Sequence, residues 1–183
     1  MKENTKQAFS KALTRLLNQY PLDEITINRL SQEAGLNRNT FYYHFHDIYE
    51  LIRYGLDQAI VELRTRIPAD ESVQERYHRI YLYILENQKC VYHIYYSVQR
   101  EYLEQFLQDV VKNILLVNII EELKEYAISE NRISFFIDTI TYAYVGLLLD
   151  WIKKGMQEDF EDQLEESIQR FETNKETILA LLL

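Results

Sequence analysis

The sequence predicts an all-α fold of about nine helices, with a small N-terminal three-helix unit ahead of a C-terminal helical bundle. Only four Gly and two Pro occur in 183 residues, so few positions interrupt a helix. Apolar residues recur at helical spacing, and the β-branched residues lie inside those patterns instead of in alternating runs. Residues 25–52 stand apart, because they combine two short apolar patterns with a Gly turn and a polar, aromatic face.

The first two helices are defined by an apolar stripe and by capping residues. The first is expected from about Thr5 to Gln19, and Pro21 stops it soon after. Thr26 is a suitable N-cap for the second helix. Gly35 ends that helix, because glycine readily adopts positive φ.

The third and fourth helices follow at once. Asn37 caps the third helix, residues 38–45. Asp47 and Glu50 then form an N-cap and N3 pair for a longer fourth helix that ends near Arg66. We therefore expect a helix-turn-helix domain over residues 1–47. A second domain over residues 48–183 would begin with the connecting helix 48–66.

Five further helices are expected beyond Pro68, over about residues 71–87, 90–98, 101–126, 133–154 and 160–182. The window Ile133–Ile152 is the most apolar, but it contains Asp138 and Asp150. A helix buried in a bundle is therefore a better interpretation than a membrane span.

The last two helices are the candidates for a dimer interface. Two such helices from each of two chains would make a four-helix interface, and packing within one chain is the alternative. The expected dimer face comprises Phe136, Tyr144, Leu148, Leu164, Ile168 and Phe171.

The net charge of −9 is unevenly distributed. Residues 1–66 hold nine Lys and Arg against eight Asp and Glu, whereas the remainder holds eleven against twenty-one. The acidic part would be repelled by phosphate, so the charge pattern would orient the molecule on a duplex. An acidic surface that only aids solubility is the simpler alternative.

The third helix presents a face suited to a DNA groove. Phe41 and Phe45, four residues apart, point to the core, and Asn39 and Tyr43 point the opposite way. An Arg side chain can contact guanine bidentately, an Asn can do the same to adenine, and hydroxyl groups suit phosphate oxygens. A solvated helical hairpin is the alternative, but it would leave two tyrosines exposed without a partner.

These residues resemble the N-terminal domain of the TetR family of bacterial transcriptional regulators. The resemblance covers about residues 5–55 and rests on Thr-Ile-x-x-Leu-x-x-Glu-Ala-Gly-Leu, followed by the run from Thr40 to Phe45. It implies a homodimer whose third helix enters the major groove of an operator. By this pattern, Thr26, Thr40 and Tyr42 contact phosphate. The positions over bases or at the groove edge are Asn28, Arg38, Asn39, Tyr43 and His44.

One position departs from the family pattern. The family usually has Lys at the start of the fourth helix, where this chain has Ile48. One phosphate contact is therefore expected to be lost. DNA affinity would then depend more on Arg38, His44, His46 and backbone N–H groups at helix starts.

The C-terminal half is rich in tyrosine, which suits either a polar, aromatic effector pocket or a core whose hydroxyls are satisfied. The pocket candidates are Tyr81, Tyr92, Tyr96, Tyr142 and Trp151. The stretch 81–96 resembles the branch of the family that includes the dihydroxyacetone kinase operon activators. That resemblance leaves open a protein co-regulator in place of a small molecule.

Nothing in the sequence favours an enzyme. Cys90 and His93 are three residues apart without an orienting carboxylate. His44 and His46 are poorly spaced to ligate a metal, and no cofactor motif is present. No secretory signal is recognised, and the single Cys suits a reducing cytoplasm.

The sequence therefore predicts a cytoplasmic, homodimeric transcriptional regulator that binds a palindromic operator and is not membrane-bound. A repressor is expected by family analogy, modulated by a small ligand or a protein co-regulator. An activator of the dihydroxyacetone-kinase-operon type, or an interaction module with weakened DNA binding, are the alternatives.

Overall fold

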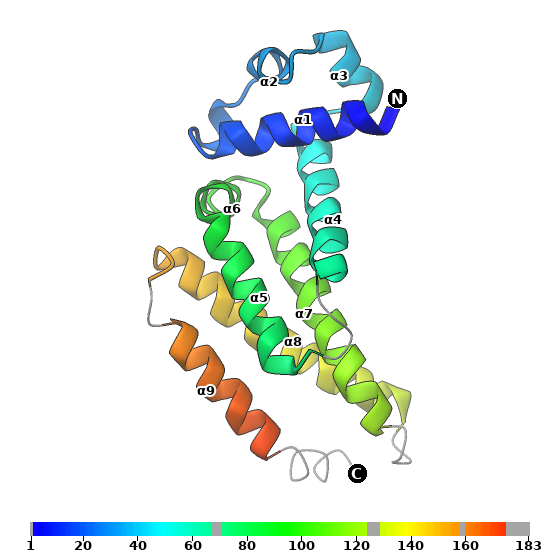
Figure 1. Cartoon of the computed structure of the whole chain (residues 1–183), viewed down its shortest axis with the longest axis vertical. Helices are drawn as coiled ribbons and strands as arrows, with labels where there is room; N and C mark the ends of the chain where they lie inside the picture. Colours follow the sequence, from blue (N-terminus) through cyan, green and yellow to red (C-terminus); the bar gives the residue numbers. More distant parts are fainter. Residues whose placement is uncertain (1, 67–70, 124–128, 158–159, 175–183) are drawn as a thin grey trace. The chain divides into compact units, whose positions relative to one another are not determined.

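A computed structural model describes residues 2–66, 71–123, 129–157 and 160–174. Within these ranges the chain forms α-helices, one short 3-10 helix and no strand (Figure 1). The elements are α1 (Lys2–Leu17), η1 (Leu22–Glu24), α2 (Ile27–Ala34), α3 (Arg38–His44), α4 (Ile48–Arg66), α5 (Val73–Glu86), α6 (Gln88–Tyr95), α7 (Arg100–Leu123), α8 (Glu130–Lys153) and α9 (Phe160–Thr173). The prediction of an all-α fold with nine α-helices is confirmed for this part of the chain.

The chain divides into two compact units that are not contiguous in sequence. The first contains residues 1–65 and 87–106, and the second contains residues 66–86 and 107–183. Helix α6 therefore groups with the N-terminal helices, although its sequence lies well inside the expected second domain. The functional boundary at residue 47 remains a prediction.

The core of the first unit is built around three phenylalanine rings. Phe9 of α1 meets Phe41 of α3 edge to face, with ring centroids 5.3 Å apart. Phe45 lies 6.4 Å from Phe9 and 5.6 Å from Phe41. All three rings are almost fully buried. A cluster of this kind contributes packing energy beyond its buried area, so α3 is fixed to α1 along its inner side.

Side chains stabilise the starts of α4 and α5, and the sequence predicted the first of these two caps. Asp47 Oδ1 accepts the backbone N–H groups of Tyr49 and Glu50, both at 2.9 Å, which confirms it as the cap of α4. Ser72 and Glu75 form a second capping box ahead of α5, with Ser72 N–H donating to Glu75 Oε2 at 2.8 Å. The Ser-x-x-Glu spacing was a readable signal for this start.

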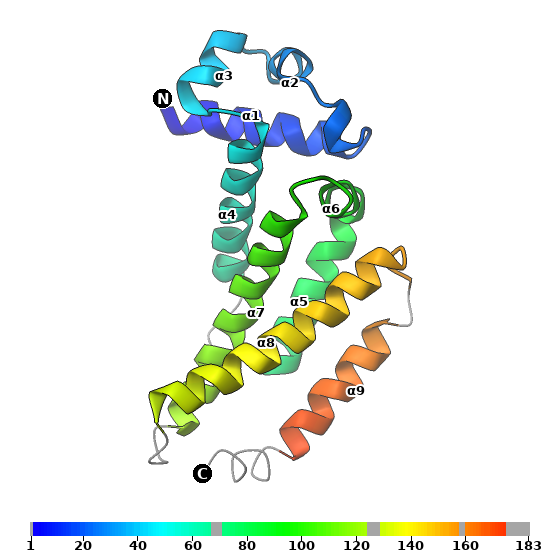
Figure 2. The same cartoon turned by 180° about the vertical axis from the view of Figure 1, so that it is seen from behind.

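In the second unit, α8 crosses α5 and the later part of α7 obliquely (Figure 1, Figure 2). Tyr144 of α8 stacks on Tyr77 of α5 with centroids 4.9 Å apart. Lys112 of α7 pairs with Asp138 of α8. Helix α9 lies against α5, where Phe160 contributes to the aromatic packing around Trp151.

Helix α8 is long and apolar enough to cross a membrane by length and composition, with a mean hydropathy of 1.4 over its best window. The core helix of a soluble bundle passes the same test. One face of α8 packs inside the unit, and the opposite face keeps Phe135, Tyr142 and Leu147 exposed. This one-sided packing suits a bundle helix that has a further apolar partner.

Most of the expected dimer face lies in the core of the single chain. Tyr144, Leu148, Leu164 and Ile168 are each at most 9 % exposed, so they stabilise the fold of one chain and present no surface to another. Phe136 is half-buried, and the side chain of Phe171 lies outside the described residues. The apolar pattern of the sequence identified the inner faces of α8 and α9. It could not separate these faces from a dimer interface, because the same apolar residue types are buried within a chain and between chains.

Several expected boundaries shift by a few residues. The first helix begins at Lys2 instead of Thr5, and η1 follows Pro21, where no helix was expected. Helix α8 begins at Glu130 instead of Ile133. The predicted ends of the seventh helix, near Tyr126, and of the ninth, near Leu182, fall outside the described residues.

Candidate nucleic-acid interface

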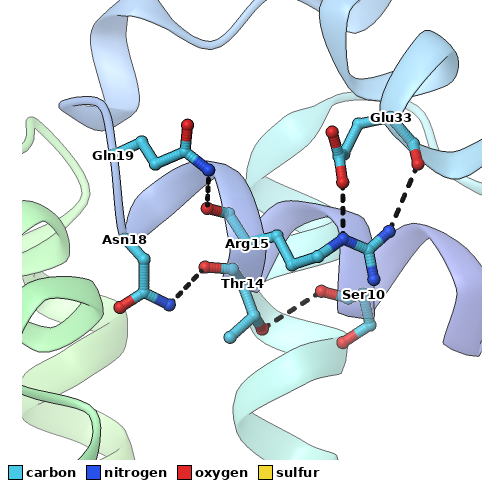
Figure 3. Close-up of polar contacts among 6 residues, drawn as sticks. All are labelled: Ser10, Thr14, Arg15, Asn18, Gln19 and Glu33. Carbon is cyan, nitrogen blue, oxygen red and sulfur yellow. Dashed lines mark hydrogen bonds and ion pairs between the residues drawn. The ribbon is translucent and has the colours of Figure 1, made fainter.

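Helix α2 is capped at its start and is tied to α1 near its end. At its start, Thr26 Oγ1 accepts the backbone N–H of Arg29 at 3.2 Å, which confirms the predicted cap. Near its end, Glu33 accepts from Arg15 of α1 in two ways (Figure 3). Arg15 Nε donates to Glu33 Oε1 at 2.5 Å, and Arg15 Nη2 donates to the Glu33 carbonyl oxygen at 3.2 Å. A two-point contact of this type fixes orientation as well as position.

The turn between α2 and α3 is set by one glycine. Gly35 has φ 66°, in the left-handed region, and the N–H of Leu36 donates to the Ser31 carbonyl at 3.0 Å. The sequence-based expectation for Gly35 is thus confirmed. Asn37 Oδ1 then accepts the N–H of Asn39 at 2.8 Å and starts α3. The chain therefore reverses sharply, as a helix-turn-helix requires.

The outward side of α3 carries large side chains that are exposed to solvent. Tyr43 is 68 % exposed and Tyr42 is 48 % exposed, while Phe41, which directly precedes them, is fully buried. Arg38 and Asn39 are exposed at the start of the same helix. An exposed polar and aromatic face on a rigid support is the usual arrangement of a helix that reads a groove.

Arg38 and Tyr42 form a local pair on this face. Arg38 Nη2 donates to the Tyr42 hydroxyl at 3.3 Å, and its guanidinium carbon lies 5.4 Å from the centre of the Tyr42 ring. This contact limits the rotamers that the long Arg side chain explores, which lowers the entropy lost on binding. Tyr43 similarly rests edge-on against His44 at 5.0 Å.

The remaining predicted positions lie around the same helix-turn-helix. Thr26 and Asn28 are exposed at the start of α2, whereas Thr40 and His44 are half-buried on the flanks of α3. All eight predicted DNA-binding residues therefore belong to α2, α3 or the cap of α2. Their contacts with DNA remain predictions.

The start of α4 carries Ile48, where the family usually has Lys, next to a histidine and a charged carboxylate. Ile48 is half-buried, and the neighbouring His46 side chain is 90 % exposed. His46 Nδ1 lies 3.2 Å from Asp47 Oδ2. Partial burial raises the pKa of Asp47, but the Glu50 N–H, the His46 side chain and the Tyr49 N–H together hold that pKa below its usual value. The carboxylate is therefore charged at neutral pH, which makes this helix start less attractive to phosphate.

The five candidate effector residues are divided between the two units. Tyr81 and Trp151 are buried in the second unit, with ring centroids 5.1 Å apart. Tyr92 of α6 and Tyr96, the residue that caps the end of this helix, belong to the first unit, where their exposed rings lie 4.6 Å apart. Tyr142 is exposed on α8. Residues with the same chemistry were grouped by sequence, but the helices that carry them belong to two different units.

A cleft of about 190 Å³ lies around the end of α8 and the start of α9. Trp151 is the one predicted effector residue in its lining, and its Nε1–H donates to the Gln157 carbonyl at 2.8 Å. The other lining residues are Leu147, Asp150, Lys154, Gln157, Phe160 and Gln163. This mixture of aromatic and charged groups could accept a small polar molecule.

A contact between α6 and α1 escaped the sequence analysis. Cys90 Sγ donates to the Thr14 carbonyl oxygen at 3.4 Å, and His93 Nδ1 lies 2.6 Å from the Leu17 carbonyl oxygen. Cys90 and His93, which the sequence shows without an orienting carboxylate, each bond to the main chain of α1. Their three-residue spacing was the available signal, since it places both on one face of a helix.

Sequence comparison identifies this architecture. Residues 11–54 match the family described as "Bacterial regulatory proteins, tetR family", and residues 71–181 match a "Transcriptional regulator C-terminal region" named for the same family. The chain belongs to the TetR family. The C-terminal match alone covers more than half of the protein, so the assignment does not depend on the helix-turn-helix only.

Solved structures of TetR-like proteins share the fold. The dihydroxyacetone kinase operon activator DhaS aligns with a TM-score of 0.70 at 22 % identity, covering 97 % of this chain and 96 % of its own. A tetR-family transcriptional regulator from Streptomyces coelicolor gives 0.66 at 17 % identity, covering 92 % and 79 %. NalD, the secondary repressor of the MexAB-OprM multidrug efflux pump in Pseudomonas aeruginosa, gives 0.54 at 15 %, covering 92 % and 96 %. No match was found among proteins of curated function.

Membership in the TetR family assigns the general roles of the two halves. In this family the N-terminal domain binds DNA, and the C-terminal domain is the ligand-binding domain. TetR-family regulators usually act as dimers on operators and are generally not enzymes. The protein is therefore a transcriptional regulator whose α3 occupies the position of the family's recognition helix.

Proposed function

We propose that the protein binds a palindromic operator as a homodimer, with α3 of each chain in the major groove. The observation that carries this proposal is the contrast within α3 between the fully buried Phe41 and the 68 % exposed Tyr43. The helix is rigidly supported on one side and open on the other. Two such helices would read half-sites about 34–36 Å apart.

The outward residues divide into base and phosphate contacts. Arg38 would contact guanine bidentately and Asn39 adenine, and each such pair discriminates by about 1–3 kcal/mol. Thr26, Thr40 and Tyr42 would hold phosphate oxygens and set the register. Asn28, Tyr43 and His44 would lie at the groove edge. Ile48 removes one cationic contact, so Arg38 takes a larger share of the affinity.

The exposed apolar side of α8 supports dimerisation. Phe135, Tyr142 and Leu147 are 76 %, 62 % and 50 % exposed, although α8 is the most apolar helix of the chain. The same face of a second chain could cover these side chains, which would form a two-fold symmetric interface. The proposed dimer face therefore differs from the one expected from the sequence. Of the residues expected there, the half-buried Phe136 lies beside it.

Regulation would act through the C-terminal half. The cleft around Trp151 is the proposed site for a small effector, and a protein co-regulator is the alternative. A coupling of about 1–3 kcal/mol between effector and operator changes occupancy about 5–150-fold. We propose that the protein is cytoplasmic and that it represses transcription when bound to its operator. Activation is the second candidate, because DhaS, an operon activator by name, aligns over nearly the whole chain.

A gel-shift assay with the DNA upstream of the protein's own gene tests operator binding. Arg38→Ala should weaken binding by about 1–3 kcal/mol, which is roughly 5–150-fold. Arg170→Ala is the matched control, because Arg170 is an exposed arginine of α9 paired only locally with Glu166. An interaction module with weakened DNA binding would instead give equal, weak retention for all three proteins.

Light scattering tests the dimer separately. Leu147→Glu should shift the mass toward one chain, since it places a charge on the proposed face. Leu82→Glu, at an exposed leucine of α5, is the matched control and should leave the mass unchanged. A wild-type mass of one chain at micromolar concentration would contradict the dimer.

A further inference from the structure

Three side chains that can ligate a metal meet between α5 and α9. His78 comes from α5, and Glu161 and Glu165 lie one turn apart on α9. One ligand atom from each residue lies within 4.8 Å of the other two. This group could not be predicted from the sequence, because its histidine and its carboxylates are far apart along the chain. Only the packing of α9 on α5 brings them together.

The contact between His78 and Glu161 is close but is not a hydrogen bond. His78 Nδ1 lies 3.0 Å from Glu161 Oε1. Nδ1 is nevertheless a buried atom without a hydrogen-bond partner in the described part of the chain, because the geometry of the contact is unsuitable. In a metal site, nitrogen and oxygen lone pairs converge on an ion and not on each other. A short separation without hydrogen-bond alignment is the arrangement expected of two such ligands.

The distances fit a small divalent cation. Bond lengths of about 2.0–2.2 Å from zinc to histidine nitrogen and carboxylate oxygen place tetrahedral ligand atoms about 3.4 Å apart. The His78–Glu161 separation is already near this value. Glu165 is exposed, so rotation of its flexible side chain can complete the triangle. A mixed nitrogen and oxygen set suits zinc and related transition metals better than calcium or magnesium.

The surroundings favour a cation and hold the two helices in place. Helix α9 carries five acidic residues and a single arginine in its described length, so its field attracts positive charge. Behind the group, Tyr81 packs 6.5 Å from Phe160, and Phe160 stacks on Trp151 at 4.9 Å. Tyr81 lies one turn from His78, and Phe160 directly precedes Glu161. Rigid rings therefore support the ligands from both helices.

We propose that His78, Glu161 and Glu165 bind one divalent transition-metal ion of the zinc type, with water completing the coordination. The ion would fasten the first turn of α9 to the middle of α5. The metal site does not involve the helix-turn-helix, so a negative zinc result would leave the proposed operator binding untouched, and the reverse also holds.

The full-length protein, stripped with a chelator, should be titrated with zinc by calorimetry and by the fluorescence of Trp151. Trp151 is the single tryptophan of the sequence, and it stacks on the residue before Glu161. We expect one zinc per chain, a change in Trp151 emission and a higher thermal midpoint. Cobalt(II) should give visible absorption bands typical of bound nitrogen and oxygen ligands.

His78→Gln and Glu161→Gln should each weaken zinc binding at least about tenfold, since losing even a hydrogen-bond partner of a ligand costs roughly 10–100-fold. Glu166→Gln, on the same helix, and His46→Gln, at an exposed histidine of the first unit, should bind zinc as the wild type does. Both ligand variants alter half-exposed side chains. Their thermal midpoints without metal, compared with that of the wild type, show whether they still fold. Absence of stoichiometric zinc in the wild type, or equal affinity in all five proteins, overturns the site.

Discussion

His93 of α6 donates a hydrogen bond from Nδ1 to the main-chain carbonyl oxygen of Leu17, at 2.6 Å. A carbonyl oxygen only accepts, so Nδ1 must carry a proton in this contact. Leu17 is the last residue of α1, and carbonyl groups at a helix end lack partners within the helix. The contact therefore closes the end of α1 with a side chain from a helix that is distant in sequence.

Removing that donor should weaken the first unit. His93→Phe keeps an aromatic ring but leaves no donor, and we expect the free energy of unfolding to fall by about 1 kcal/mol. His93→Asn should lose less, because its side-chain amide can donate from nearly the Nδ1 position. Urea denaturation measures both. Equal stability of the two variants would show that the ring, and not the donor, matters.

Removing the hydroxyl of Thr141 should increase stability, whereas removing the His93 donor should decrease it. Thr141 is 2 % exposed in α8, and its Oγ1 has no hydrogen-bond partner within the described residues. Thr141→Val should raise the free energy of unfolding by up to about 1 kcal/mol, since it removes a buried polar group without a partner at nearly constant volume.

Thr139 provides the matched control on the same helix. Its exposed Oγ1 donates to the Phe135 carbonyl at 2.8 Å. Thr139→Val should therefore give no gain in stability. If Thr141→Val were destabilising while Thr139→Val was neutral, the Thr141 hydroxyl must have a partner in solution.

Cys90 should resist thiol reagents in the folded protein. Burial raises the pKa of its thiol to about 11, so only about one molecule in a thousand carries the reactive thiolate at pH 8. We expect modification at least about 100-fold slower in buffer than in urea, where the ordinary thiol pKa of about 8.5 returns. Rapid labelling of the native protein would show that α6 leaves α1 frequently.

The cap of α4 should respond to acid. The pKa of Asp47 is lowered in the folded state, so its contribution to stability is present above the usual value of 3.8 and is lost as pH falls through the folded pKa. Asp47→Ala should cost about 1 kcal/mol at pH 7, and Asp47→Asn should cost less. The gap between wild type and Asp47→Asn should narrow below about pH 4, measured by denaturation across pH. A constant gap would mean that the Asp47 charge does not contribute.

Local signals explain why the N-terminal unit could be predicted so closely. The caps Thr26, Asn37 and Asp47 and the turn at Gly35 act over three or four residues, so a short stretch of sequence contains all the information that they need. The same holds for the inward spacing of the Phe rings in α3. The outward residues of α3 follow directly, because they occupy the opposite side of a short helix; their contacts with DNA stay predictions.

Longer-range features could not be obtained in this way. A helix that is apolar on several sides, such as α8, does not show which side a second chain would cover. The sequence therefore predicts Leu148 in the dimer interface, whereas Leu148 is buried within one chain and Leu147 is exposed. The tyrosines of the supposed effector pocket were grouped by composition, and the structure distributes them over two units.

The sequence by itself determined the all-α class, the order of the helices and the geometry of the helix-turn-helix, because capping, turn formation and amphipathic spacing act between neighbours in the chain. Only the tertiary structure decided that His93 meets Leu17, that Tyr81 meets Trp151 and that His78 meets Glu161. Each of these pairs depends on how whole helices pack, and packing is selected by the summed burial of many side chains at once.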